Sequence, residues 1–125
     1  QTDYGEYTEN VRGKGGRKMT IERIRKDLLD IRYYYARKTL FDRAANCIAK
    51  NATIRKAEQY NCFIENAPPK LYDIYIMLYV KSNTQRATAE KLGYSECYIR
   101  RLNKQLYMFF QTAFAADRRK DKHGS

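Results

Sequence analysis

The sequence predicts an all-α protein, a helical domain whose C-terminal part consists of two helices folded around a tight turn. From Thr20 onward, apolar residues recur at spacings of three and four, which is the period of one helix face. No stretch alternates apolar and polar residues as a half-buried strand does. At 125 residues the chain is long enough for one domain with a substantial core.

The charge of the chain favours a polyanion as partner. Twenty-five Lys and Arg residues against fourteen Asp and Glu residues give a formal net charge of +11. Residues 20–50 contain eight basic and four acidic side chains, and residues 84–113 contain five and two. The excess therefore follows helical segments, as it does on a nucleic-acid-binding surface.

Cysteine use and hydropathy indicate a cytoplasmic protein without a metal or cofactor. Cys47, Cys62 and Cys97 are odd in number and lack the spacing of metal ligands, so we expect reduced thiols. No apolar run is long enough to span a membrane, and no secretory signal is evident. We therefore expect no membrane contact.

The N-terminal half predicts a tail and one long helix. Residues 1–19 hold four of the six glycines and predict a flexible tail. Thr20 is a suitable N-cap for a helix that runs to about Lys50. The consecutive tyrosines at 33–35 must point in different directions, with one or two of them in the core. The apolar stripe of this helix comprises Ile21, Ile24, Leu28, Ile31 and Tyr35, continued by Phe41, Ala45 and Ile48.

Two further helices complete a support region over residues 20–83. One begins at Asn51 or Thr53 and runs to about Asn66, where Ala67-Pro68-Pro69 ends it. The next, from Lys70 to about Val80, is apolar on most sides, which is typical of a central buried helix. The inward residues of the first of these are Ile54, Ala57, Ile64 and either Tyr60 or Asn61.

The stretch from Thr84 to Leu106 has the pattern of a helix-turn-helix. Thr84 can cap the first helix, Gly93 suits the positive φ of a helix end, and Ser95 can cap the second helix. Ile99, Leu102 and Leu106 form the inner face of that second helix, and Asn103 falls with the basic residues on the rest of it. Such a motif places its second helix in the major groove of DNA.

The helix continues beyond the motif, so the helix-turn-helix and its extension occupy residues 84–116. Its aromatic run, Phe109, Phe110 and Phe114, is expected to return onto the first helix. A homodimer interface would use the same residues. Residues 117–125 form a charged tail.

These residues resemble the region 4 helix-turn-helix of bacterial sigma-70 family factors. The resemblance rests on Thr84-Gln85, Ala89, residues 92–95, residues 98–100 and residues 102–106. With the YYYARK segment and the AP-KLYD-Y pattern, the whole chain is similar to small sigma-like transcription regulators of Firmicutes phages and mobile elements, of the ArpU and RinA type. The resemblance implies promoter DNA binding and contact with RNA polymerase. No region 2, which opens promoter DNA in a complete sigma factor, is evident.

Docking of the second helix in the groove assigns roles to its outer residues. Arg100 and Arg101 can form forked bonds to guanine edges, and Glu96 can accept from a cytosine amino group. Lys104 and the start of the first helix suit phosphates. Tyr94 and Tyr98 are expected in the core. The expected DNA-contacting residues are Thr84, Gln85, Arg86, Ser95, Glu96, Cys97, Arg100, Arg101 and Lys104.

Three other functions compete with sequence-specific DNA binding. A sigma-like interaction module would bind RNA polymerase or another protein without selecting DNA. A phage small terminase subunit also couples a helix-turn-helix to helical assembly. An enzyme is the weakest candidate, because the single histidine, His123, lies in the charged tail and no nucleophile and base share a motif. Asp27 and Asp30 are interpreted as part of a solvated helix face.

Overall fold

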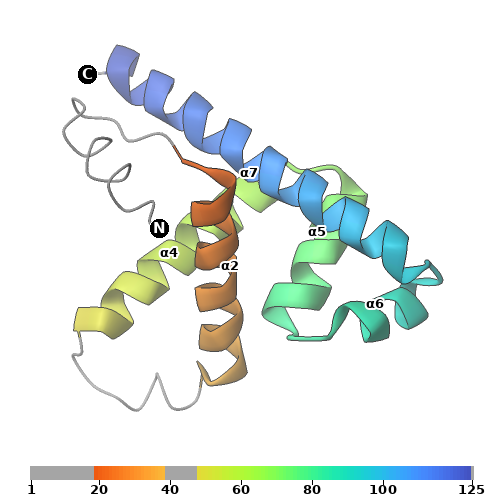
Figure 1. Cartoon of the computed structure of the whole chain (residues 1–125). Coiled ribbons are helices and arrows are strands. Elements are labelled where there is room, and N and C mark those ends of the chain that lie inside the picture. Colours follow the sequence, from red (N-terminus) through yellow and green to blue (C-terminus); the bar gives the residue numbers. More distant parts are fainter. Residues whose placement is uncertain (1–18, 39–47, 125) are drawn as a thin grey trace.

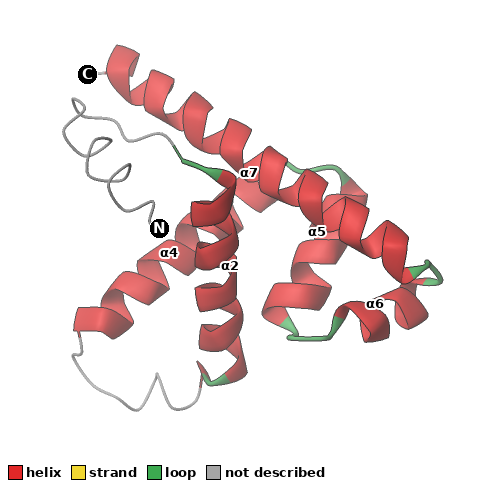
Figure 2. Ribbon diagram, in the orientation of Figure 1, coloured by secondary structure: helices red, strands yellow, loops and turns green. Residues whose placement is uncertain are grey.

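The computed structural model describes residues 19–38 and 48–124, and every regular element within these ranges is a helix (Figure 2). The all-α prediction is therefore confirmed. Figure 1 shows the order of the elements and the long last helix crossing the others. They are α2 (Ile21–Ala36), α4 (Ile48–Ile64), α5 (Pro69–Tyr75), the π-helical turn η1 (Ile76–Val80), α6 (Gln85–Leu92) and α7 (Glu96–Gly124).

Three helices start where the sequence places hydroxyl caps, and a fourth starts at a proline. Each capping oxygen accepts from the backbone N–H three residues later, which satisfies a donor that the helix start leaves without a partner. Pro69 opens α5 and has no N–H to leave unsatisfied there. The three capping bonds are Thr20 to Arg23 at 3.1 Å, Thr84 to Ala87 at 3.0 Å and Ser95 to Tyr98 at 3.1 Å.

The prediction of one helix from Thr20 to Lys50 is wrong. Helix α2 ends at Ala36, and Arg37 leaves the helical region with φ −122° and ψ 31°. Of the residues expected to continue the stripe, Phe41 and Ala45 lie outside the described residues, and Ile48 begins α4. The helical spacing of apolar residues continues past the end of α2, although the helix itself does not. The reason is that α2 and α4 both bury their apolar stripes in the same core.

The predicted boundaries of the next two helices also shift. Helix α4 starts before Asn51 and ends at Ile64. The third helix begins at Pro69, and its last five residues form the π turn η1, in which the Lys81 N–H donates to the Ile76 carbonyl at 2.8 Å. A π turn is wider than an α-helical turn. Tyr79 in η1 and Tyr75 directly before it are both buried, and their ring centroids lie 6.1 Å apart.

The combined helix α5–η1 is the hub of the fold, as the sequence predicts. It packs against α2, α4, α6 and α7, and α7 in turn crosses α2, α4 and α5 (Figure 1). The predicted charged tail continues α7 as far as Gly124. The core side chains that the hub contributes are Leu71, Ile74, Tyr75, Leu78 and Tyr79.

The aromatic run of α7 returns onto the other helices of the domain. Phe110 is fully buried and meets Tyr60 of α4 edge to face, at 4.7 Å between centroids. Phe114 packs in the same way on Tyr60 and Phe63. Gln111 donates to the Met19 carbonyl at 2.9 Å, which ties α7 to the residue before the Thr20 cap.

A polar cluster joins α2 to α4, and it corrects the interpretation of Asp27 as solvated. Asp27 is only 8% exposed; it accepts a 2.7 Å hydrogen bond from the Tyr60 hydroxyl and lies 3.1 Å from the Lys56 ammonium. Asp30 also binds Lys56, at 3.0 Å. Burial and the neighbouring Asp27 carboxylate raise the pKa of Tyr60 far above its ordinary value, so its hydroxyl stays a donor.

Candidate functional site

A tight turn joins α6 to α7 and fixes the relative placement of these two helices. Gly93 has φ 76° and ψ 31°, the left-handed conformation that closes a helix end. The next N–H, that of Tyr94, donates to the Ala89 carbonyl at 2.9 Å. Ala89 and Ile99 are buried between the helices, and the small alanine allows their close approach.

The start of α7 has one buried face and one basic face. Ile99, Leu102 and Leu106 are at most 3% exposed and belong to the core. The exposed residues of the other face recur at spacings of three and four, so they occupy about 100° of the helix circumference. They are Cys97, Arg100, Arg101 and Lys104.

The nine predicted DNA-contacting residues lie on α6, on α7 or at their N-caps. Eight of them are exposed, and Gln85 is half-buried. Two of them, Thr84 and Ser95, use their hydroxyl oxygens as caps, so their structural role is established by geometry. The structure thus displays a set of polar and charged side chains on two adjacent helices.

The arginines of this surface are held only weakly by neighbouring carboxylates. Arg100 lies 3.9 Å from Glu96, and Arg86 lies 3.8 Å from Glu90, each one helical turn away. Exposed pairs at these distances contribute little free energy. Within residues 19–38 and 48–118, no carboxylate pairs with Arg101 or Lys104. The cationic groups can therefore exchange these contacts for phosphates or base edges.

Tyr94 and Tyr98 pack at the edge of the core, in agreement with the prediction. Both are half-buried, and their rings meet edge to face at 4.9 Å between centroids. The ammonium group of Lys70, at the start of α5, donates to the Tyr98 hydroxyl at 3.0 Å. This hydrogen bond raises the pKa of Lys70. Lys70 thus adds an exposed cation beside α7, which the sequence analysis missed.

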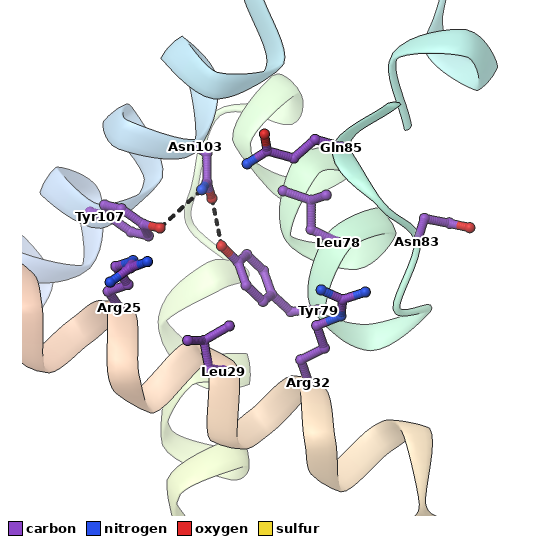
Figure 3. Close-up of a pocket in the computed structure, with 9 residues that line it drawn as sticks. All are labelled: Arg25, Leu29, Arg32, Leu78, Tyr79, Asn83, Gln85, Asn103 and Tyr107. Atoms are coloured by element: carbon purple, nitrogen blue, oxygen red, sulfur yellow. Dashed lines mark hydrogen bonds between the residues drawn. The ribbon is translucent and has the colours of Figure 1, made fainter. Parts of the chain in front are cut away.

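Asn103 was expected among the basic residues outside the apolar row of α7, but the structure buries it in the core. It is 7% exposed, and its amide oxygen accepts from the Tyr79 hydroxyl at 2.6 Å (Figure 3). Its amide nitrogen donates to the Tyr107 hydroxyl at 3.0 Å. Burial raises the pKa of Tyr79 well above its ordinary value. Asn103 follows Leu102 directly, so it lies about 100° further around the helix axis, at the edge of the apolar stripe. At such a position, packing of the neighbouring helix determines whether the side chain is buried.

A polar pocket of about 180 Å³ lies beside Asn103, between α2, η1 and the start of α6. Its lining includes two arginines of α2, which the sequence analysis did not select, and no carboxylate. Their separation by seven residues was a usable signal, because it places both on one helix face. The lining residues are Arg25, Leu29, Arg32, Leu78, Tyr79, Asn83, Gln85, Asn103 and Tyr107.

Comparisons with protein-family models, with curated proteins and with solved structures gave no match for this chain. In the described part of the chain, no group of three or more His, Cys, Asp or Glu side chains is placed to hold a metal ion. The helices described there include none with the length and apolar character needed to cross a membrane. Cys62 and Cys97 are exposed free thiols, and Cys47 lies outside the described residues.

Proposed function

We propose that the protein binds double-stranded DNA sequence-specifically, through a helix-turn-helix formed by α6 and α7. The observation that carries the proposal is the exposed cationic face at the start of α7, directly opposite its buried apolar face. A recognition helix needs this division, because one side must be held by the domain while the other enters the major groove. Arg100 and Arg101 supply the forked donors that guanine edges accept.

The start of α6 supports a phosphate contact in the same complex. Thr84 caps the helix, and Gln85 and Arg86 occupy its first two positions. Backbone N–H groups at a helix start carry partial positive charge and favour a phosphate. In this arrangement α6 contacts the sugar-phosphate backbone while α7 reads the bases.

The resemblance to sigma-70 region 4 supports a role in transcription. We propose a phage or mobile-element regulator that acts at promoters and contacts RNA polymerase. The pseudo-twofold symmetry of many operators would suit a homodimer. The net charge of +11 would accelerate association with DNA through its long-range field.

Selection of bound fragments from a random duplex pool tests the proposal. The wild-type protein should enrich a defined sequence, and an Arg100→Ala/Arg101→Ala variant should lose both the enrichment and most of the affinity. The matched control is Lys26→Ala/Arg55→Ala, which removes two exposed cations from α2 and α4. Normal selection by the Arg100→Ala/Arg101→Ala variant would disprove this site.

The same experiment separates the competing functions. Binding to a protein partner without any enriched DNA sequence would favour the interaction module that binds RNA polymerase or another protein. A small terminase subunit would instead form ring-sized particles, which light scattering detects at low protein concentration.

A further inference from the structure

The pocket beside Asn103 is chemically suited to an anion. Its two charged lining residues are Arg25 and Arg32, one turn either side of Leu29 on the same face of α2. Since no lining residue is acidic, nothing in the pocket wall neutralises these two charges. Its volume of about 180 Å³ is more than ten times the roughly 15 Å³ that a single water molecule requires. The pocket therefore has room for a polyatomic ligand.

The two guanidinium groups have different roles. Nη2 of Arg32 donates to the Ser82 carbonyl at 3.0 Å, so this side chain is fixed in place with further N–H donors remaining. Arg25 is exposed and extends from α2 toward Tyr107 (Figure 3). Within the described ranges no acceptor or carboxylate pairs with Arg25. Arg32 therefore forms a fixed part of the pocket wall, and Arg25 is a charge for which the described residues supply no partner.

The hydrogen bonds under the pocket leave a hydroxyl proton to donate. Tyr79 gives its proton to the Asn103 oxygen, and Asn103 gives an amide proton to the Tyr107 oxygen. Since the Tyr107 oxygen already accepts this bond, its own proton remains for another acceptor. The Tyr79 hydroxyl oxygen is one acceptor within its reach. Because Tyr107 also lines the pocket, its hydroxyl can turn this proton toward a ligand instead.

Helix α6 adds a further positive contribution. Gln85, its first residue, lines the pocket, and its side-chain amide is turned toward Asn103 (Figure 3). The first N–H groups of a helix have no acceptor inside the helix and carry the positive end of its dipole. Two guanidinium groups, a phenol and this helix start therefore surround one volume.

From this convergence we propose that the pocket binds a phosphate group, with Arg25 as its principal charged ligand. A phosphate presents several acceptor oxygens and matches the forked donors of arginine. The group has two sources. It can be a backbone phosphate of the duplex bound by α6 and α7, and that source depends on the proposed function. It can also be the phosphate of a small free molecule.

Nuclear magnetic resonance tests the pocket without DNA. Pyrophosphate is titrated into the full chain at constant ionic strength, with chloride as the reference anion. The side-chain amide signals of Gln85 and Asn103 should shift to saturation in the wild-type protein. The shifts should vanish in Arg25→Ala and persist in Lys26→Ala, which removes an exposed charge from the adjacent position of α2. Arg25→Lys should bind more weakly, because an ammonium cannot form the fork.

A second titration with duplex DNA identifies the source of the phosphate. If the pocket takes a backbone phosphate, the same two amide signals shift, and Arg25→Ala weakens every duplex by a similar factor. It also lowers the slope of log K against log salt by about 1. Shifts with pyrophosphate alone assign the pocket to a small phosphorylated molecule.

The outcomes keep the two proposals apart. Shifts with neither pyrophosphate nor DNA would overturn the pocket proposal, even if DNA binding through Arg100 were intact. Failure of the wild-type protein to bind any duplex would overturn the proposed function, whereas saturable pyrophosphate shifts would still support the pocket.

Discussion

The hydroxyl of Tyr79 in η1 donates a 2.6 Å hydrogen bond to the side-chain oxygen of Asn103 in α7, and both residues are buried. This bond joins the hub of the domain to the helix that presents the basic face. Because it is made away from solvent, breaking it leaves a polar atom without a partner.

Asn103→Leu should therefore lower the free energy of unfolding by about 1–3 kcal/mol, because the Tyr79 hydroxyl loses its acceptor. Denaturant unfolding followed by circular dichroism measures this change. Adding Tyr79→Phe to Asn103→Leu should restore part of the loss, since the unpaired hydroxyl is then removed. Strictly additive losses in this double-mutant cycle would show that the bond contributes nothing.

Gly93→Ala should destabilise the protein by roughly 1–2 kcal/mol, because an L-residue is strained at φ 76°. A Cβ atom at this position meets nothing within 4 Å, so the cost arises from the backbone alone. Gly93→Asn should cost less, since asparagine tolerates this conformation. Thermal unfolding of the two variants provides the comparison, and equal melting temperatures would contradict the argument.

Phe110→Ala should lower the free energy of unfolding by about 3–5 kcal/mol, because it empties a fully buried site against Tyr60 and Tyr75. Met108→Ala is the matched control on the same helix, since Met108 is 55% exposed. Its effect should stay within about 0.5 kcal/mol. A similar loss in both variants would place Phe110 outside the core.

Stability should fall at alkaline pH. Burial raises the pKa of Tyr60, Tyr75 and Tyr79 above the ordinary value, so the folded protein retains protons that the unfolded chain releases above about pH 10. The free energy of unfolding should therefore be nearly independent of these groups below that pH and decrease above it. Urea titrations from about pH 8 to pH 11 measure the slope. Tyr60→Phe should reduce the slope, because it removes one of the three ionising groups.

Lys104→Ala and Arg100→Ala should weaken DNA binding in different ways. In the proposed complex with DNA, Lys104 contacts a phosphate, so its loss should reduce the affinity by a similar factor for all sequences and decrease the salt slope by about 1. Loss of Arg100 should also relax the preference at one base pair, at a cost of about 1–3 kcal/mol for the preferred site. Competition binding with single-base variants of the selected duplex distinguishes the two.

The helix starts could be predicted from the sequence, because they depend on capping residues next to each helix. Thr20, Thr84 and Ser95 cap the helices that they were predicted to cap, and Gly93 has the predicted positive φ. A cap depends only on a side chain and a backbone group three residues away. The end of α2 was not predicted, because no glycine or proline marks Ala36 and the apolar period continues past it. That break follows from the packing of α2 and α4 around a common core.

For the candidate site, the sequence likewise predicted features that depend on one helix, and it missed those that depend on contacts between helices. Eight of the nine selected residues are exposed, because helical periodicity separates an outer from an inner face. Asn103 was misplaced and Arg25 and Arg32 were missed, because their surroundings come from other helices. Asn103 lies against Tyr79 of η1, and the two arginines line a pocket together with Gln85 of α6. No spacing within one helix encodes such a contact.

The sequence by itself determined that the chain is helical, where most helices start, and which face of α7 carries its charge. These properties depend on neighbours within four residues. The tertiary structure alone decided where α2 ends, that Asp27 and Asn103 are buried in hydrogen-bonded networks, and that two arginines of α2 share a pocket with the start of α6. The buried hydrogen bonds and the shared pocket require residues at least 24 positions apart to meet, which only the packing of the helices brings about.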